Sequence, residues 1–134
     1  MERNNETIVA LYQLLGRVFY AAAQADKKVR PEEISKLKQI VKEDWLDFED
    51  TADEFNSDSA YQIEIVFDYL VDKGVVQEDV IRELGEFKKI HSSLFTMALV
   101  ELIMQTAYRI VSSFAKRNKS ELVFLSQLRA VLEK

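Results

Sequence analysis

The feature that most constrains this 134-residue chain is its shortage of turn-forming residues, because it contains one proline and three glycines. Sandwiches and barrels of β-strands need many tight turns, and glycine and proline supply most of them. Helical bundles need far fewer, since short loops of varied composition connect antiparallel helices. The sequence therefore predicts an all-α fold, and its length fits a single domain over residues 1–134.

Apolar residues recur at spacings of three and four, which predicts six helices, each with one buried face. We expect them over about residues 7–24, 31–42, 59–73, 77–90 and 94–115, and from 118 onward. Pro31 suits the start of the second helix, Gly74 the end of the third, and Ser92 and Ser93 can cap the fifth. The fifth helix is the most hydrophobic, and we expect it to cross the middle of the core. The inward residues expected of the last two helices are Leu94, Met97, Ala98, Leu102, Ile103, Thr106, Ile110, Phe114, Leu122, Leu125, Leu128 and Leu132.

Charge is distributed unevenly along the chain. Residues 43–72 contain eleven of the 23 acidic residues and no lysine or arginine. The acidic balance and the lack of a basic stripe with interleaved aromatics argue against nucleic-acid binding. No apolar run reaches the roughly 20 residues that cross a bilayer, and no signal-peptide pattern is seen, so we expect a cytoplasmic protein without membrane insertion. The absence of cysteine excludes disulfides and thiolate metal sites.

The segment 43–58 is an acidic connector that contains three aromatic residues, Trp45, Phe48 and Phe55. Aromatic side chains are favoured anchors in interfaces, so these three are candidates for contact with a protein partner. The alternative is that the aromatics cover the ends of the neighbouring helices while the acids face water or pair with lysines. The sequence leaves both interpretations open.

Most catalytic arrangements are missing from the sequence. His91 is the only histidine, which excludes any site that needs a pair of histidines or a three-histidine zinc site, and we expect it at the exposed end of the fourth helix. The glycines are isolated, so no phosphate-binding loop is present. Gly16 and Gly85 are expected instead to let two helices pack closely. We therefore expect a protein that is not an enzyme.

The turn between the first two helices carries acids at regular positions. Asp26 precedes the second helix, where its carboxylate can accept hydrogen bonds from backbone N–H groups, and Glu33 can hold the same turn closed. Alternatively, Asp26, Glu33 and Glu32 hold a divalent cation, because hard ions bind carboxylate oxygens. Such ions usually take more ligands than these three residues supply. No other cofactor is expected.

The chain also contains a weak internal repeat. A shift of 88 positions places Leu11 on Leu99 and Glu33 on Glu121 without a gap. This register predicts two similar helical hairpins that pack on each other, with the third and fourth helices at their sides. Since any two amphipathic hairpins can share such a register, true duplication stays open.

The segment 22–33 resembles the signature of the TerB-like tellurite-resistance family, in which a helix ends in Ala-Asp-Gly and a glutamate follows seven positions after the aspartate. Asp26, Val29 and Glu33 match this signature, whereas Lys27 replaces the glycine. In the second hairpin Glu121 matches, and a phenylalanine stands where a second aspartate is expected. The resemblance covers the first two and last two helices and leaves residues 43–93 unmatched. It implies a compact helical bundle with roles in stress or tellurite resistance, association with membrane-bound assemblies and, in some members, metal binding.

These observations together predict a non-enzymatic helical module that binds or scaffolds a protein partner. The alternative is a divalent-metal sensor or a small metal-dependent enzyme that uses Asp26 and Glu33. The sequence leaves the identity of the partner and any association between copies of the chain open.

Overall fold

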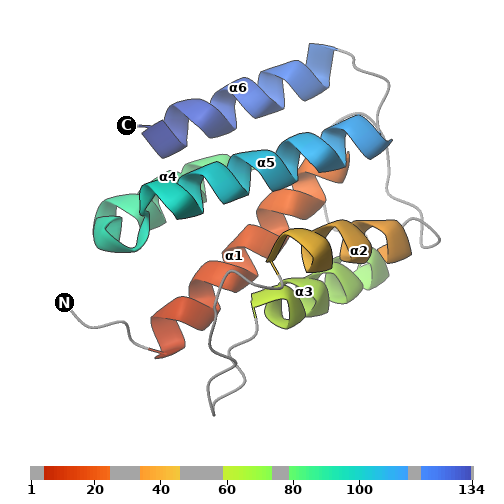
Figure 1. Cartoon of the computed structure of the whole chain (residues 1–134), viewed down its shortest axis with the longest axis horizontal. Helices are drawn as coiled ribbons and strands as arrows, with labels where there is room; N and C mark the ends of the chain where they lie inside the picture. Colours follow the sequence, from red (N-terminus) through yellow and green to blue (C-terminus); the bar gives the residue numbers. More distant parts are fainter. Residues whose placement is uncertain (1–4, 25–33, 46–58, 74–78, 115–118, 134) are drawn as a thin grey trace.

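The computed structural model describes residues 5–24, 34–45, 59–73, 79–114 and 119–133. Within these ranges the chain forms six α-helices and one short 3-10 helix, and no strand. The elements are α1 (Asn5–Gln24), α2 (Ile34–Trp45), α3 (Ser59–Lys73), α4 (Val80–Ile90), the 3-10 helix η2 (Ser92–Leu94), α5 (Met97–Phe114) and α6 (Lys119–Glu133) (Figure 1). The predicted all-α bundle of six helices is confirmed. No helix in the described ranges combines the length and hydrophobicity needed to cross a membrane.

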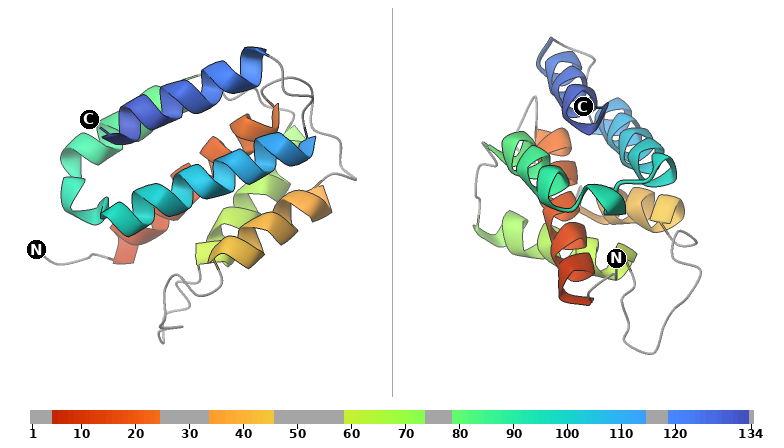
Figure 2. Two further views of the ribbon diagram at one scale, coloured as in Figure 1. Left: turned by 45° about the horizontal axis from the view of Figure 1, so that its top comes forward. Right: turned by 90° about the vertical axis from the view of Figure 1, so that its left-hand side faces the viewer.

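The centre of the bundle is α1, which packs against α3, α4 and α5 and also contacts α6. Figure 2 shows α2 and α3 on one side of α1, and α4, α5 and α6 on the other. Leu15, Val18 and Phe19 of α1 have no exposed surface, and its alanines Ala22 and Ala23 are buried as well. The expectation that the fifth helix crosses the middle of the core is therefore wrong. Small residues let neighbours approach α1 from several sides, whereas α5 keeps one side exposed.

The two predicted hairpins also differ from each other in the structure. α5 and α6 pack as an antiparallel pair (Figure 1). α2, in contrast, packs mainly on α3 and α5 rather than on α1. The two segments that the shift of 88 positions aligns therefore have similar apolar spacing but pack against different neighbours.

Gly16 lies where α1 crosses α3. A Cβ atom added there would lie 2.8 Å from Cβ of Val66 and 3.1 Å from the backbone oxygen of Ile63. The predicted close helix packing is confirmed at this position, because any side chain would force the helices apart. At Gly85 the nearest atom, Cγ1 of Val131, is 3.4 Å from the added Cβ, which leaves room for a methyl group.

The start of α5 differs from the prediction. Ser92 and Ser93 form part of η2, and the backbone N–H of Phe95 donates to the Ser92 oxygen. The residue that caps α5 is Thr96, whose Oγ1 accepts from the backbone N–H of Leu99 at 3.1 Å. The prediction of a serine cap is therefore wrong, because the extra 3-10 turn shifts the beginning of the helix by several residues.

Candidate functional site

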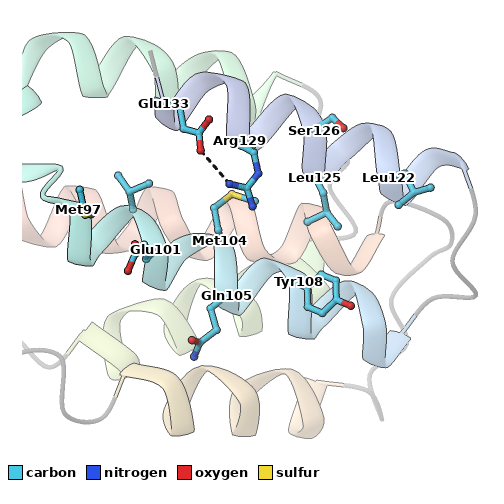
Figure 3. Close-up of a pocket in the computed structure, with 11 residues that line it drawn as sticks. Met97, Glu101, Met104, Gln105, Tyr108, Leu122, Leu125, Ser126, Arg129 and Glu133 are labelled. Atoms are coloured by element: carbon cyan, nitrogen blue, oxygen red, sulfur yellow. Dashed lines mark hydrogen bonds and ion pairs between the residues drawn. The ribbon is translucent and has the colours of Figure 1, made fainter.

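The described part of the chain forms a groove of about 1080 Å³ between α5 and α6 (Figure 3). Its residues follow helical spacing on both helices, so one continuous stripe of each faces the groove. The stripe of α5 consists of Met97, Val100, Glu101, Met104, Gln105 and Tyr108. The stripe of α6 consists of Leu122, Leu125, Ser126, Arg129 and Glu133.

Three large apolar side chains of the groove are more than half exposed. Met97 is 77% exposed, Leu122 60% and Tyr108 55%. Met104 and Leu125 are half-buried and pack against the hydrophobic core. The floor of the groove is therefore continuous with the core, and its rim exposes apolar surface.

Charged groups gather toward one end of the groove. Met97 and Glu101 lie at that end, Glu133 and Arg129 lie nearer the middle, and Tyr108 and Leu122 lie toward the other end (Figure 3). Arg129 pairs with Glu133 on the same helix, with 3.0 Å between Nη1 and Oε2. The carboxylate of Glu101 has no side-chain partner among the described residues. The groove therefore combines apolar contact area with one free acid and one exposed ion pair.

The groove is lined by apolar side chains together with a few polar and charged ones. It contains no histidine and no paired acids held together by hydrogen bonds. Across the residues that the structure describes, no group of three histidine, aspartate or glutamate side chains is arranged to hold a metal ion. Apolar area, a tyrosine and an arginine are typical of interfaces between proteins.

Trp45, a predicted partner contact, instead lies in the core without exposed surface. Its ring centroid lies 5.9 Å from that of Phe19 and 6.4 Å from that of Tyr12, and its Nε1 donates to Oγ1 of Thr106 at 2.9 Å. The assignment of Trp45 as an anchor for a partner is corrected: the side chain covers the end of α2, as the alternative interpretation expects. Phe48 and Phe55 lie outside the described residues.

A hydrogen-bonded cluster continues from Trp45 and joins α2 to α5. Thr106 Oγ1 donates to Oδ2 of Asp44 at 2.9 Å, and Asp44 also pairs with Arg109. Arg109 reaches Oε1 of Glu43 at 2.8 Å. The Arg109 guanidinium holds the pKa of Glu43 below its usual range, and Glu43 in turn raises the pKa of Arg109. Because acids at a helix C-terminus are unfavourable, Arg109 offsets the charge of this end of α2.

Most of the other predicted site residues belong to segments that the structure does not describe. Asp26, Glu32 and Glu33 lie outside the described residues, so the proposed cation site stays a prediction. His91 ends α4 as expected, but it is half-buried, and its ring packs on Phe87 with 4.5 Å between centroids.

The sequence-based interpretation missed the groove because α5 is apolar on two faces. The spacing predicts that Met97 and Leu122 point inward, yet both are exposed. The residues of α5 that are buried are Leu99, Ile103, Thr106, Ala107, Ile110 and Val111. The signal that identifies the second face is a separate stripe at positions 97, 100, 104 and 108, which has helical spacing of its own.

Comparison with known proteins gives no relative from which a function could be transferred. No model of a protein family matches the chain, and neither a curated protein nor a solved structure matches it.

Proposed function

We propose that this chain is a non-enzymatic helical binding module whose binding surface is the groove between α5 and α6. The observation that carries the proposal is the exposure of Met97, Tyr108 and Leu122 along one groove. Full burial of a large apolar side chain is worth about 1.5–3 kcal/mol. Coverage of these three side chains by a partner would therefore contribute several kcal/mol toward association.

The groove has the form that a helix of a partner protein fits. Its two walls are antiparallel helices, and each presents residues at spacings of three and four, as in helical bundles. A helix laid along the groove would insert its own apolar stripe between these rows. Met97 and Met104 add adaptability, since the flexible thioether side chain fills irregular gaps.

The TerB-like resemblance extends this proposal to a biological setting. By this resemblance, we propose that the module acts as a scaffold in stress or tellurite resistance. The alternative proposal is that Asp26 and Glu33 bind a divalent cation. The groove supports the binding module more directly, because its residues lie within the described structure and form one continuous surface.

Hydroxyl-radical footprinting with mass spectrometry tests the groove whatever its occupant. We expect Met97 and Tyr108 to oxidise more slowly in cells that produce the chain than in dilute purified protein. Tyr69 is the matched control, because it is exposed to a similar extent (59%) but lies on α3 away from the groove. Because other cell components also consume radicals, the oxidation of Met97 and Tyr108 is expressed relative to that of Tyr69, and this ratio should fall in cells. An unchanged ratio would contradict the proposal.

A further inference from the structure

We propose that α6 is a detachable helix, which leaves the bundle as one unit while α1 to α5 stay folded. This inference requires no occupant in the groove between α5 and α6, so it stands apart from the proposed function. It is carried by a contrast between α6 and the other helices. Side-chain hydrogen bonds or ion pairs join α1 to α5 with one another, whereas none joins the described residues of α6 to another helix.

Polar contacts connect each of the first five helices to a neighbour. Arg17 of α1 binds both carboxylate oxygens of Glu83 of α4, with 2.7 Å from Nη1 to Oε1 and 2.9 Å from Nη2 to Oε2. Lys38 of α2 lies 2.9 Å from Oδ1 of Asp68 of α3, measured from Nζ. The cluster around Arg109 joins α2 to α5. Separation of any of these pairs of helices would break at least one directional contact.

The attachment of α6 is apolar. Its described side chains, in residues 122–133, make no hydrogen bond or ion pair with another helix. The ion pair of Arg129 stays within α6, because its partner is Glu133. Detachment of α6 therefore breaks no side-chain hydrogen bond between these residues and the rest of the bundle. It requires only that apolar surface be exposed to water.

This apolar attachment is also narrow. Among the described side chains of α6, Leu128 and Leu132 are the two that are buried. α6 packs on α4 and α5 and makes a smaller contact with α1. Where Val131 lies over Gly85 of α4, the space for a methyl group shows that the two helices are not in their closest possible packing. Few buried apolar contacts are typical of elements that open before the whole domain unfolds.

The remaining helices keep a core when α6 leaves. α4 also packs on α1, and α5 also packs on both α1 and α2. α1, which lies at the centre, retains its contacts with α3, α4 and α5. The groove does not survive, because α6 forms one of its two walls. Detachment of α6 therefore converts a chain with a groove into a folded chain without one.

Native-state hydrogen exchange of the full chain, followed by NMR under conditions where closing is faster than exchange, tests the inference. We expect the amides in the middle of α6 to share one protection factor, about 100-fold or more below that of the slowest amides of α1. A shared value indicates release of the whole helix. Amides of α6 as protected as those of α1 would overturn the inference, as would a gradual decrease toward one end of α6, which indicates fraying.

The variant Ile40→Val separates detachment from global unfolding. Ile40 is buried on α2, which lies on the opposite side of α1 from α6 (Figure 2). Its contacts are the same whether α6 is attached or detached, so the variant should leave the protection of α6 unchanged. The slowest amides of α1 require global unfolding, and their protection should fall by about 2- to 10-fold. An equal decrease in α6 would refute detachment, because α6 would then exchange only when the whole chain unfolds.

The variant Leu132→Ala is the matched change inside the attachment. Leu132 is buried only while α6 is attached, so its truncation should lower the protection of α6 by about 30-fold or more. Unchanged protection of α6 would mean that its amides exchange without leaving the bundle, which contradicts the inference. Circular dichroism should show that both variants keep the helix content of the wild type.

Discussion

Replacement of Thr106 by valine tests how the buried cluster between α2 and α5 contributes to stability. Thr106 has no exposed surface, and its hydroxyl accepts from Nε1 of Trp45 and donates to Asp44. Valine has nearly the same shape and a similar helix propensity, so the substitution removes both hydrogen bonds with little change in packing. The buried Trp45 N–H would then lose the Thr106 hydroxyl as acceptor, whereas Asp44 would keep Arg109.

A buried polar group without a partner costs about 1–3 kcal/mol. We therefore expect Thr106→Val to lower the free energy of unfolding by about 2 kcal/mol. For a domain of this size the loss corresponds to a decrease in Tm of about 7 °C. Thr106→Ser is the matched control, because it keeps the hydroxyl and removes only a methyl group. Its expected cost is about 1 kcal/mol.

Urea denaturation followed by circular dichroism measures both variants. Trp45 is the only tryptophan, so its fluorescence reports the same transition from inside the cluster. A double-mutant cycle with Trp45→Phe isolates the hydrogen bond, and we expect a coupling energy of about 1 kcal/mol with Thr106→Val. A Thr106→Val variant that is no more destabilised than Thr106→Ser, or a cycle without coupling, would refute a stabilising role for this hydrogen bond.

Three further predictions concern single positions or contacts. Gly16→Ala should destabilise the chain by about 1–2 kcal/mol, because the added methyl group overlaps with α3. Gly85→Ala should stabilise it by up to about 1 kcal/mol, because alanine has the higher helix propensity. Thermal denaturation measures both changes, and equal effects of the two substitutions would contradict close packing at Gly16 alone. Arginine hydrogen bonds hold the pKa of Glu83 and Glu43 below the usual range, so their stabilisation is complete above about pH 4.3 and lost as the pH falls through the lowered pKa. Glu83→Gln should therefore flatten the decrease in Tm below pH 5, and an unchanged pH profile would contradict this. Titration with calcium, magnesium, manganese or zinc should give no heat and no shift in Tm, because the predicted carboxylate turn supplies too few ligands; a shift that Asp26→Asn removes would instead establish the cation site.

The number of helices and most of their limits could be predicted from the sequence, because they depend on local signals. Ser59 begins α3 and Lys73 ends it, as the capping pattern and Gly74 indicate. Apolar spacing locates the other helices to within a few residues. The start of α5 was missed because the backbone there forms an additional 3-10 turn, and several polar residues compete to cap the helix.

The candidate site could not be predicted in the same way, because spacing does not decide which of two apolar faces points inward. That decision depends on neighbouring helices that are distant in sequence. Trp45 illustrates the same limit, since its place in an acidic segment suggests an exposed anchor, yet Tyr12 and Phe19 of α1 enclose it.

The rotation of α5 about its own axis connects the buried cluster to the exposed groove. Consecutive residues of an α-helix are about 100° apart, so positions two apart point in nearly opposite directions. Thr106 is two positions from both Met104 and Tyr108, which line the groove. As long as Thr106 is bonded to Trp45 and Asp44, the groove residues must face away from α2. A rotation that buried Tyr108 would break these hydrogen bonds inside the protein. The exposure of the groove is therefore a consequence of the polar cluster on the opposite face of the same helix.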